Sequence, residues 1–274
     1  MHSLIHVAEM VDLMDAPRLV GLKTYVADVG RTRDFWSQHF GLTPVAQDVA
    51  LRYLLGDLLW EQWPGGRFCG ARGPHGALPV FRIQEFSHAR GYLLAHQIPI
   101  VFEELIPGLS LLIFLDPDNN PFELAQETDP GEWKIAARRA LRTKQRIDPP
   151  QRRPVDLEGV AELTIYTHDI TASVQFYKEI VGLPVGLAYF AHVHLAAENV
   201  AVVLRTTRWQ CKAREQPHGS EPIFAVRDLD ALRARLLQAG YDPSDEDGGM
   251  VVRDPVGIPL HFRSKSQEAP SLDI

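Results

Sequence analysis

Two histidines in the second half of the chain are spaced in a way that suits chemistry. His192 and His194 are two residues apart in a stretch that reads as a strand, so both side chains point to the same face of a sheet. Imidazoles on one face could ligate a metal ion, or one of them could transfer a proton beside a cavity. Exposed or hydrogen-bonded strand histidines are the simpler interpretation. We take His194 as the candidate acid–base residue of this pair.

The chain contains two copies of one sequence pattern. The first copy reads Val26-Ala27-Asp28, Phe35-Trp36 and Gly41-Leu42, and the second reads Thr167-His168-Asp169, Phe176-Tyr177 and Gly182-Leu183. In both copies the aspartate precedes the first aromatic residue by 7 positions and the glycine by 13. Each copy later carries a second shared phrase, which begins at Asp116-Pro117 and Asp254-Pro255. The repeat predicts two similar halves, and the positions at which they differ are where function should be sought.

Composition excludes several classes of function. The chain has 274 residues, 45% of them hydrophobic, with a formal net charge of −7 and no long basic stripe, so nucleic acid is not the expected partner. Apolar runs such as Leu111–Leu115 are far shorter than a membrane span. Cys69 and Cys211 lie in different halves, which argues against a disulfide framework and favours a reducing cytoplasm. The first residues carry no signal-peptide pattern.

The pattern of strands, helices and glycines predicts an α+β fold. Each half reads as two units of the order strand–helix–strand–strand–strand, with helices ending at glycines such as Gly41. The expected divisions are a tail (1–17), a first module (18–127), a linker with a basic helix over 133–144 (128–157), a second module (158–266) and a C-terminal tail (267–274). The linker helix is interpreted as a solvated helix or as a patch for an acidic partner.

The repeated phrases resemble the vicinal oxygen chelate superfamily, which includes glyoxalases, bleomycin-resistance proteins and extradiol dioxygenases. The phrase over 20–42, its partner over 162–183 and the two Asp-Pro phrases carry the resemblance, and 226–240 is similar to another phrase of the family. It implies two tandem modules, each with two units that form a curved mixed sheet around a cavity. It also implies metal ligands on the first and last strands of units, although one fold hosts many functions.

The resemblance implies a metal site in the second module. Counting seven residues back from the acids that begin the helices reaches Glu162 and Glu221, and seven beyond Asp254 lies His261. Two carboxylates and one imidazole can hold Fe, Mn, Ni or Zn and leave positions open for a substrate. The family dioxygenases have two histidines and then a glutamate, so the order here is inverted. The alternative is two strand-end glutamates and a hydrogen-bonded histidine.

The same count in the first module reaches Gly21 and Leu78, which cannot ligate, and Glu123. We therefore expect that module to be metal-free. Strand alternation from these positions offers Lys23 and Arg82 beside Glu123 as inward-facing charges, either as an internal ion-pair cluster or as an anion-binding pocket.

Other side chains complete the candidate site. Tyr166 lies on the inward row that begins at Glu162, and we interpret it as a catalytic or substrate-binding hydroxyl. Arg263, two residues after His261, is expected to bind substrate at the cavity mouth. His218 is a candidate proton shuttle in a polar loop. Trp60, Trp63 and Trp209 could line pockets or belong to the core.

Two functions follow as expectations. The first is a metal-dependent enzyme, a dioxygenase or a glyoxalase-like lyase or isomerase, that acts on a small oxygen-rich substrate in the second module. The second is a metal-free protein that sequesters a small ligand, as bleomycin-resistance proteins do. The expected partner in either case is a small molecule, with a homodimer as a further possibility.

Overall fold

The computed structural model describes residues 15–65, 76–106, 108–127, 154–188, 192–206, 219–246 and 248–267. The expected linker helix over 133–144, His218, Trp209, both cysteines and most of each tail lie outside the described residues. Within them, no helix is long and apolar enough to cross a membrane.

Four consecutive units build the molecule, as the sequence predicts. The first contains β1 (Arg18–Val26), α1 (Val29–Phe40), β2 (Ala46–Gln47), β3 (Leu51–Leu55) and β4 (Leu58–Pro64). The second contains β5 (Leu78–Ile83), α2 (Phe86–Ala95), β6 (Ile100–Ile106), β7 (Leu109–Leu115) and β8 (Pro121–Glu127).

The third and fourth units repeat this order. The third contains β9 (Leu157–Thr167), α4 (Ile170–Gln175) continued by the π-helical segment η2 (Phe176–Val181), β10 (Val185–Ala188), β11 (His192–Ala196) and β12 (Ala201–Thr206). The fourth contains β13 (Glu221–Val226), α5 (Leu229–Gln238), β14 (Ser244–Glu246), β15 (Gly249–Arg253) and β16 (Pro259–Ser264), followed by the short 3₁₀ helix η3 (Lys265–Gln267).

Aspartates begin three of the helices. The carboxylates of Asp28, Asp169 and Asp228 each accept a hydrogen bond from the backbone amide three residues later, at 2.9, 2.9 and 2.8 Å. This bond satisfies a donor that the first turn of a helix leaves unpaired. The α1 and η2 segments end before Gly41 and Gly182, which have φ of 63° and 92°, the left-handed conformation that glycine adopts at no steric cost. The duplicated phrase is therefore a repeated pair of helix boundaries.

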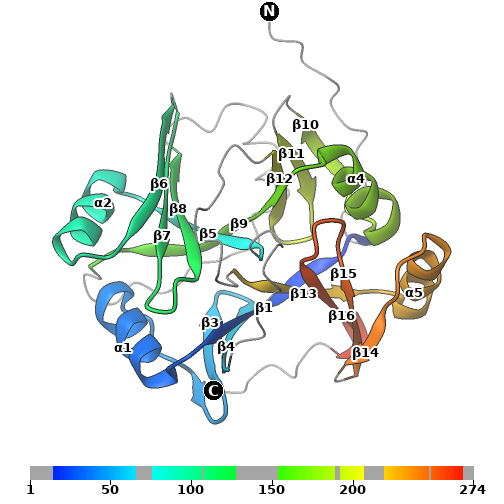
Figure 1. Ribbon diagram of the computed structural model, residues 1–274, viewed down its shortest axis with the longest axis horizontal. Helices are drawn as coiled ribbons and strands as arrows, with labels where there is room; N and C mark the ends of the chain where they lie inside the picture. The colour runs from blue at the N-terminus through cyan, green and yellow to red at the C-terminus, as the bar shows by residue number, and fades with distance from the viewer. Residues whose placement is uncertain are drawn as a thin grey trace, which may run out of the picture.

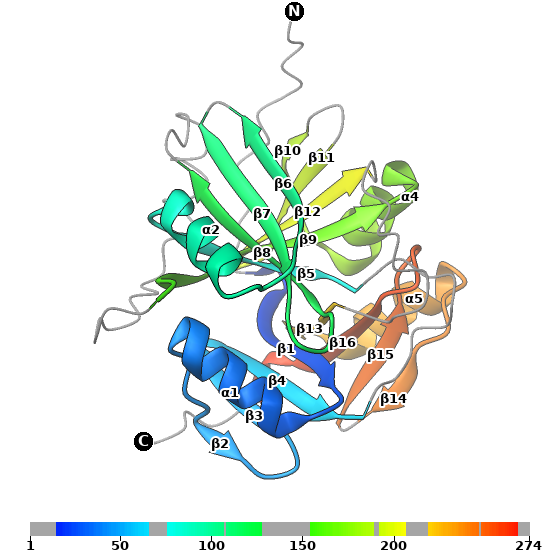
Figure 2. The ribbon, with the colours of Figure 1, turned by 60° about the vertical axis from the view of Figure 1, so that its left-hand side comes forward.

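The described strands form two mixed eight-stranded sheets. The β1/β13 sheet has the order β14-β15-β16-β13-β1-β4-β3-β2, and the β5/β9 sheet has the order β10-β11-β12-β9-β5-β8-β7-β6. Figure 1 shows the β5/β9 sheet in the upper half of the molecule and the β1/β13 sheet in the lower half, with the helices toward the outside. In Figure 2, α1 lies beside β3 and β4 and α2 beside β7 and β8. The predicted α+β class and the repeated strand–helix–strand–strand–strand order are confirmed.

The partnership of the units differs from the expectation. Each module was expected to close its own sheet, but β1 of the first unit pairs with β13 of the fourth, and β5 of the second pairs with β9 of the third. The ranges 18–127 and 158–266 therefore do not correspond to the two sheets. All four units begin with an equivalent strand, so the local pattern does not specify which two of these strands pair.

A core of aromatic side chains joins the two sheets. Trp36 of α1 is fully buried, with its ring centroid 4.7 Å from that of Trp60 in the β1/β13 sheet and 4.8 Å from that of Phe122 in the β5/β9 sheet. The indole of Trp60 donates a hydrogen bond to Thr24 at 2.9 Å. Trp60 is thus a core residue. Because side chains alternate along a strand, Glu61 and Glu123, which follow Trp60 and Phe122, point to the opposite face, which we call the inner face of each sheet.

Candidate functional site

The side chains singled out from the sequence separate into two groups, one on each inner face. The β1/β13 sheet carries Lys23 on β1, Glu221 on β13, and His261 and Arg263 on β16. The β5/β9 sheet carries Arg82 on β5, Glu123 on β8, Glu162 and Tyr166 on β9, and His194 on β11. The predicted triad of Glu162, Glu221 and His261 is therefore wrong. Glu162 pairs with Val80 and Ala201 in the β5/β9 sheet, because the third and fourth units do not share a sheet.

The turn before β16 fixes the position of His261. The Asp254 carboxylate accepts hydrogen bonds from the amides of Val256 and Ile258 at 3.0 and 2.8 Å and from the hydroxyl of Tyr177 at 2.8 Å. Burial raises the pKa of Asp254 to about 6, although these hydrogen bonds oppose the rise. The Asp-Pro phrase is thus a rigid turn that sets the register of β16 rather than part of a reacting group.

His261 lies between two carboxylates on the β1/β13 inner face. Its Nε2 is hydrogen-bonded to Glu221 Oε2 at 2.8 Å, and its Nδ1 lies 2.8 Å from Glu246 Oε2. The second contact is close, but its direction is not that of a hydrogen bond, since Glu246 Oε2 has no such partner. Glu221 therefore orients the ring, and Glu246 acts on it through its charge. The side chains of His261 and Glu221 are only 6% and 8% exposed.

Lys23 and Glu61 extend this cluster across the sheet. Lys23 pairs in register with Glu221 on one side and with Glu61 on the other, and its Nζ lies 3.6 Å from Glu246 Oε1. The carboxylate of Glu61 accepts a hydrogen bond from Arg52 Nε at 3.0 Å. Glu61, Glu246 and Arg52 were not among the residues predicted from the sequence. The alternation of β4 after Trp60 is the signal that could have placed Glu61.

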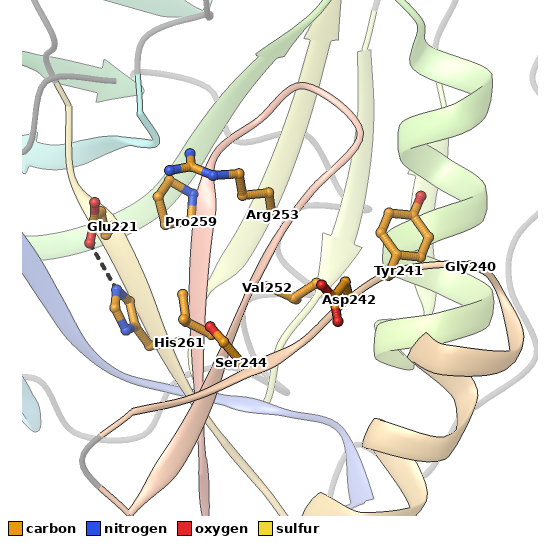
Figure 3. Close-up of a pocket in the computed structure, with 10 residues that line it drawn as sticks. Glu221, Gly240, Tyr241, Asp242, Ser244, Val252, Arg253, Pro259 and His261 are labelled. Atoms are coloured by element: carbon orange, nitrogen blue, oxygen red, sulfur yellow. Dashed lines mark hydrogen bonds and ion pairs between the residues drawn. The ribbon is translucent and has the colours of Figure 1, made fainter. Parts of the chain in front are cut away.

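A cavity of about 470 Å³ opens on the fourth unit beside His261 and Glu221. Its lining comes from β13, β15, β16 and the segment after α5, namely Glu221, Gly240, Tyr241, Asp242, Ser244, Val251, Val252, Arg253, Pro259 and His261. Figure 3 shows the Glu221–His261 pair at one end of this group and Tyr241 at the other. Arg253 Nη1 donates a hydrogen bond to the backbone carbonyl of Gly257 at 2.8 Å, which positions its guanidinium. The volume is typical of small-molecule sites.

The donors present do not form the metal site that the resemblance implies. Such a site needs at least three side-chain donors directed at one point, at about 2.0–2.3 Å from the ion. In the described ranges, no group of three His, Cys, Asp or Glu side chains is arranged to hold a metal ion. Both nitrogens of His261 already face carboxylates, and Lys23 adds an ammonium to the same cluster.

A second polar cluster lies on the β5/β9 inner face. Glu123 is fully buried, and its nearest ion-pair partner is Arg205 at 3.8 Å. Neither of its carboxyl oxygens has a hydrogen-bond partner within the described part of the chain. Burial raises the pKa of Glu123 to about 7, with Arg205 opposing the rise and Glu162 adding to it. Burial also raises the pKa of Tyr166 well above its ordinary value.

The expected cluster of Lys23 and Arg82 around Glu123 is corrected by this arrangement. Lys23 belongs to the other sheet, and the cation beside Glu123 is Arg205, a residue that was not predicted from the sequence. Register places Arg205 beside Tyr166 of β9 and beside His192 of β11. The rings of His192 and His194 are 5.1 Å apart between centroids, so both histidines share one face, as their spacing predicts.

Comparison with known proteins identifies the fold. No family model and no curated protein matches the chain. A solved structure from Bacillus subtilis, provisionally named a dioxygenase, is 15% identical with a TM-score of 0.65, over 93% of this chain and 86% of that one. Glyoxalase I from Zea mays is 14% identical with a TM-score of 0.59, over 92% of this chain and 94% of that one. At these identities the likeness shows the fold.

Proposed function

We propose, from the vicinal oxygen chelate fold that the chain adopts, that it binds a small polar molecule in the cavity beside Glu221 and His261 without a metal ion. The observation that carries the proposal is the cavity itself, about 470 Å³ in volume, with an oriented Glu221–His261 pair in its wall. The absence of a metal-type group among the described donors favours binding without metal over the metal-dependent enzyme that the sequence also suggested.

The lining indicates the chemistry of the ligand. Glu221 and Asp242 supply carboxylates, while Arg253 supplies a guanidinium and Ser244 a hydroxyl. A ligand with an acidic group and a hydrogen-bond donor, such as a small amino or hydroxy acid, would pair with both signs of charge. Burial of the ligand in this cavity would strengthen those contacts, because the interior has a lower effective dielectric constant than water.

Thermal-shift measurements test the proposal. The purified protein is screened against small amino, hydroxy and keto acids, once in EDTA and once with added Mn²⁺, Ni²⁺ or Zn²⁺. A ligand that binds only the folded state stabilises it by about 2.7 kcal/mol at a concentration of 100 Kd. We expect a ligand to stabilise the unaltered chain in EDTA. Arg253→Ala and Glu221→Gln should each raise the Kd for that ligand at least tenfold.

The matched control is Arg227→Ala, because the Arg227 side chain is 75% exposed and forms an ion pair with Asp15, away from the residues that line the cavity. This variant should bind as the unaltered chain does. The proposal is overturned by ligand binding that requires an added divalent ion, or by Arg253→Ala and Glu221→Gln having no effect on a ligand that binds.

A further inference from the structure

The β1/β13 inner face contains the ingredients of a metal site, yet they are arranged around a lysine. Glu61, Glu221 and His261 lie on β4, β13 and β16, and each side chain is at most 9% exposed. These strands flank β1 in the order β16, β13, β1, β4. Carboxylate and imidazole groups at such positions are ligands for divalent ions in proteins. A further carboxylate, Glu246, lies against His261 at 2.8 Å.

Lys23 lies on β1, between the strands that carry Glu221 and Glu61. It is the register partner of Glu221 in β13 and of Glu61 in β4, so its side chain lies between theirs on the same face. Its side chain is 8% exposed, and its Nζ lies 3.6 Å from Glu246. Lys23 is therefore a neighbour of all three carboxylates: Glu221 and Glu61 are its partners on the adjacent strands, and Glu246 is its ion-pair partner.

Charge explains why a cation is needed there. The buried carboxylates of Glu61 and Glu221 and the partly exposed carboxylate of Glu246 repel one another, and burial of an anion is costly unless a positive charge compensates it. Arg52 compensates Glu61 through a 3.0 Å contact, which leaves Lys23 as the cation that balances Glu221 and Glu246. A divalent ion among the same side chains would lie close to an ammonium, and the two cations would repel each other.

We infer that Lys23 is a built-in replacement for a divalent cation at this site. Its ammonium supplies fixed positive charge among Glu61, Glu221 and Glu246 and excludes a metal ion from them. The inference goes beyond the proposed ligand and does not depend on it, because it concerns how the unliganded site is neutralised.

Removal of the lysine should convert the cluster into a metal site. Isothermal titration of chelator-treated protein with Zn²⁺, Ni²⁺ and Mn²⁺ measures the effect directly. We expect Lys23→Ala and Lys23→Met to gain one site per chain that binds at least one of these ions ten times more tightly than the unaltered chain does. Adding Glu221→Gln to Lys23→Met should remove the gained site.

Lys178→Met is the matched control, since Lys178 has a half-exposed side chain that pairs with Glu179 on the outside of the molecule. It should gain no site. Circular dichroism establishes that each variant folds, and the methionine variant keeps the length of the lysine side chain in case alanine disrupts packing. The inference is overturned by stoichiometric metal binding to the unaltered chain with Lys23 intact, which needs no variant, or by folded Lys23 variants that gain no site.

Discussion

Replacement of Glu123 by glutamine should stabilise the protein at alkaline pH and leave it unchanged at acidic pH. Glu123 is fully buried, and burial raises its pKa from 4.5 to about 7. Between these values the folded protein keeps a proton that the unfolded chain has released. The free energy of unfolding therefore falls as the pH rises from about 4.5 to about 7, and this group contributes no further change outside that window.

The magnitude follows from the size of the shift. A rise of the pKa from 4.5 to about 7 corresponds to about 3 kcal/mol, at about 1.4 kcal/mol per pKa unit. At pH 5 most of the carboxyl is protonated in the folded state and resembles the amide in shape and charge. Glu123→Gln should then match the unaltered chain to within about 1 kcal/mol, whereas at pH 8 it should be more stable by about 2–3 kcal/mol.

Denaturation by guanidinium chloride at pH 5, 6, 7 and 8 measures this difference. Asp116 and Asp254 also have raised pKa values, about 7 and about 6, caused mainly by burial, so the unaltered chain should lose stability over the same range for three reasons. The informative quantity is the difference between the two proteins at each pH. Glu179→Gln is the control, because its side chain is 59% exposed. Parallel pH profiles for Glu123→Gln and the unaltered chain would refute the reasoning.

Substitutions at three further positions test the framework that positions the two inner faces. Tyr177→Phe removes the 2.8 Å hydrogen bond to the Asp254 carboxylate and should lower the free energy of unfolding by about 1–3 kcal/mol. Urea titrations should show a larger loss at pH 8 than at pH 5. Gly249→Ala places a Cβ against the backbone carbonyl of Phe262 and should cost about 1–3 kcal/mol, seen as a lower Tm by calorimetry; an unchanged Tm would contradict the packing. Asp169→Ala removes the 2.9 Å N-terminal cap of α4 and should lower the free energy of unfolding by about 1 kcal/mol. Asp169→Asn should keep most of that stability in the same calorimetric measurement.

The local pattern was sufficient to predict the scaffold. The spacing from Asp28 to Gly41, repeated from Asp169 to Gly182, identifies helix boundaries, because caps and left-handed glycines depend on residues close in sequence. Alternation along the strands placed Lys23, Glu123 and His261 on inner faces for the same reason, since the period of a strand is local. The candidate side chains were therefore found one at a time.

Which of these side chains become neighbours could not be predicted from the local pattern. Arg205 and Glu123 are neighbours only because β9 pairs with β5, and Lys23 meets Glu221 only because β1 pairs with β13. The predicted metal triad failed at Glu162 because the count assumed that consecutive units share a sheet.

By itself, the sequence determined four repeated units, their helix boundaries and the residues that face inward, all of which depend on contacts within a few positions. Only the tertiary structure decided which charges meet. The four units present equivalent first strands to one another, so the choice of partner lies in long-range packing, such as that of Trp36 between Trp60 and Phe122. That choice put Lys23 rather than Glu162 beside Glu221.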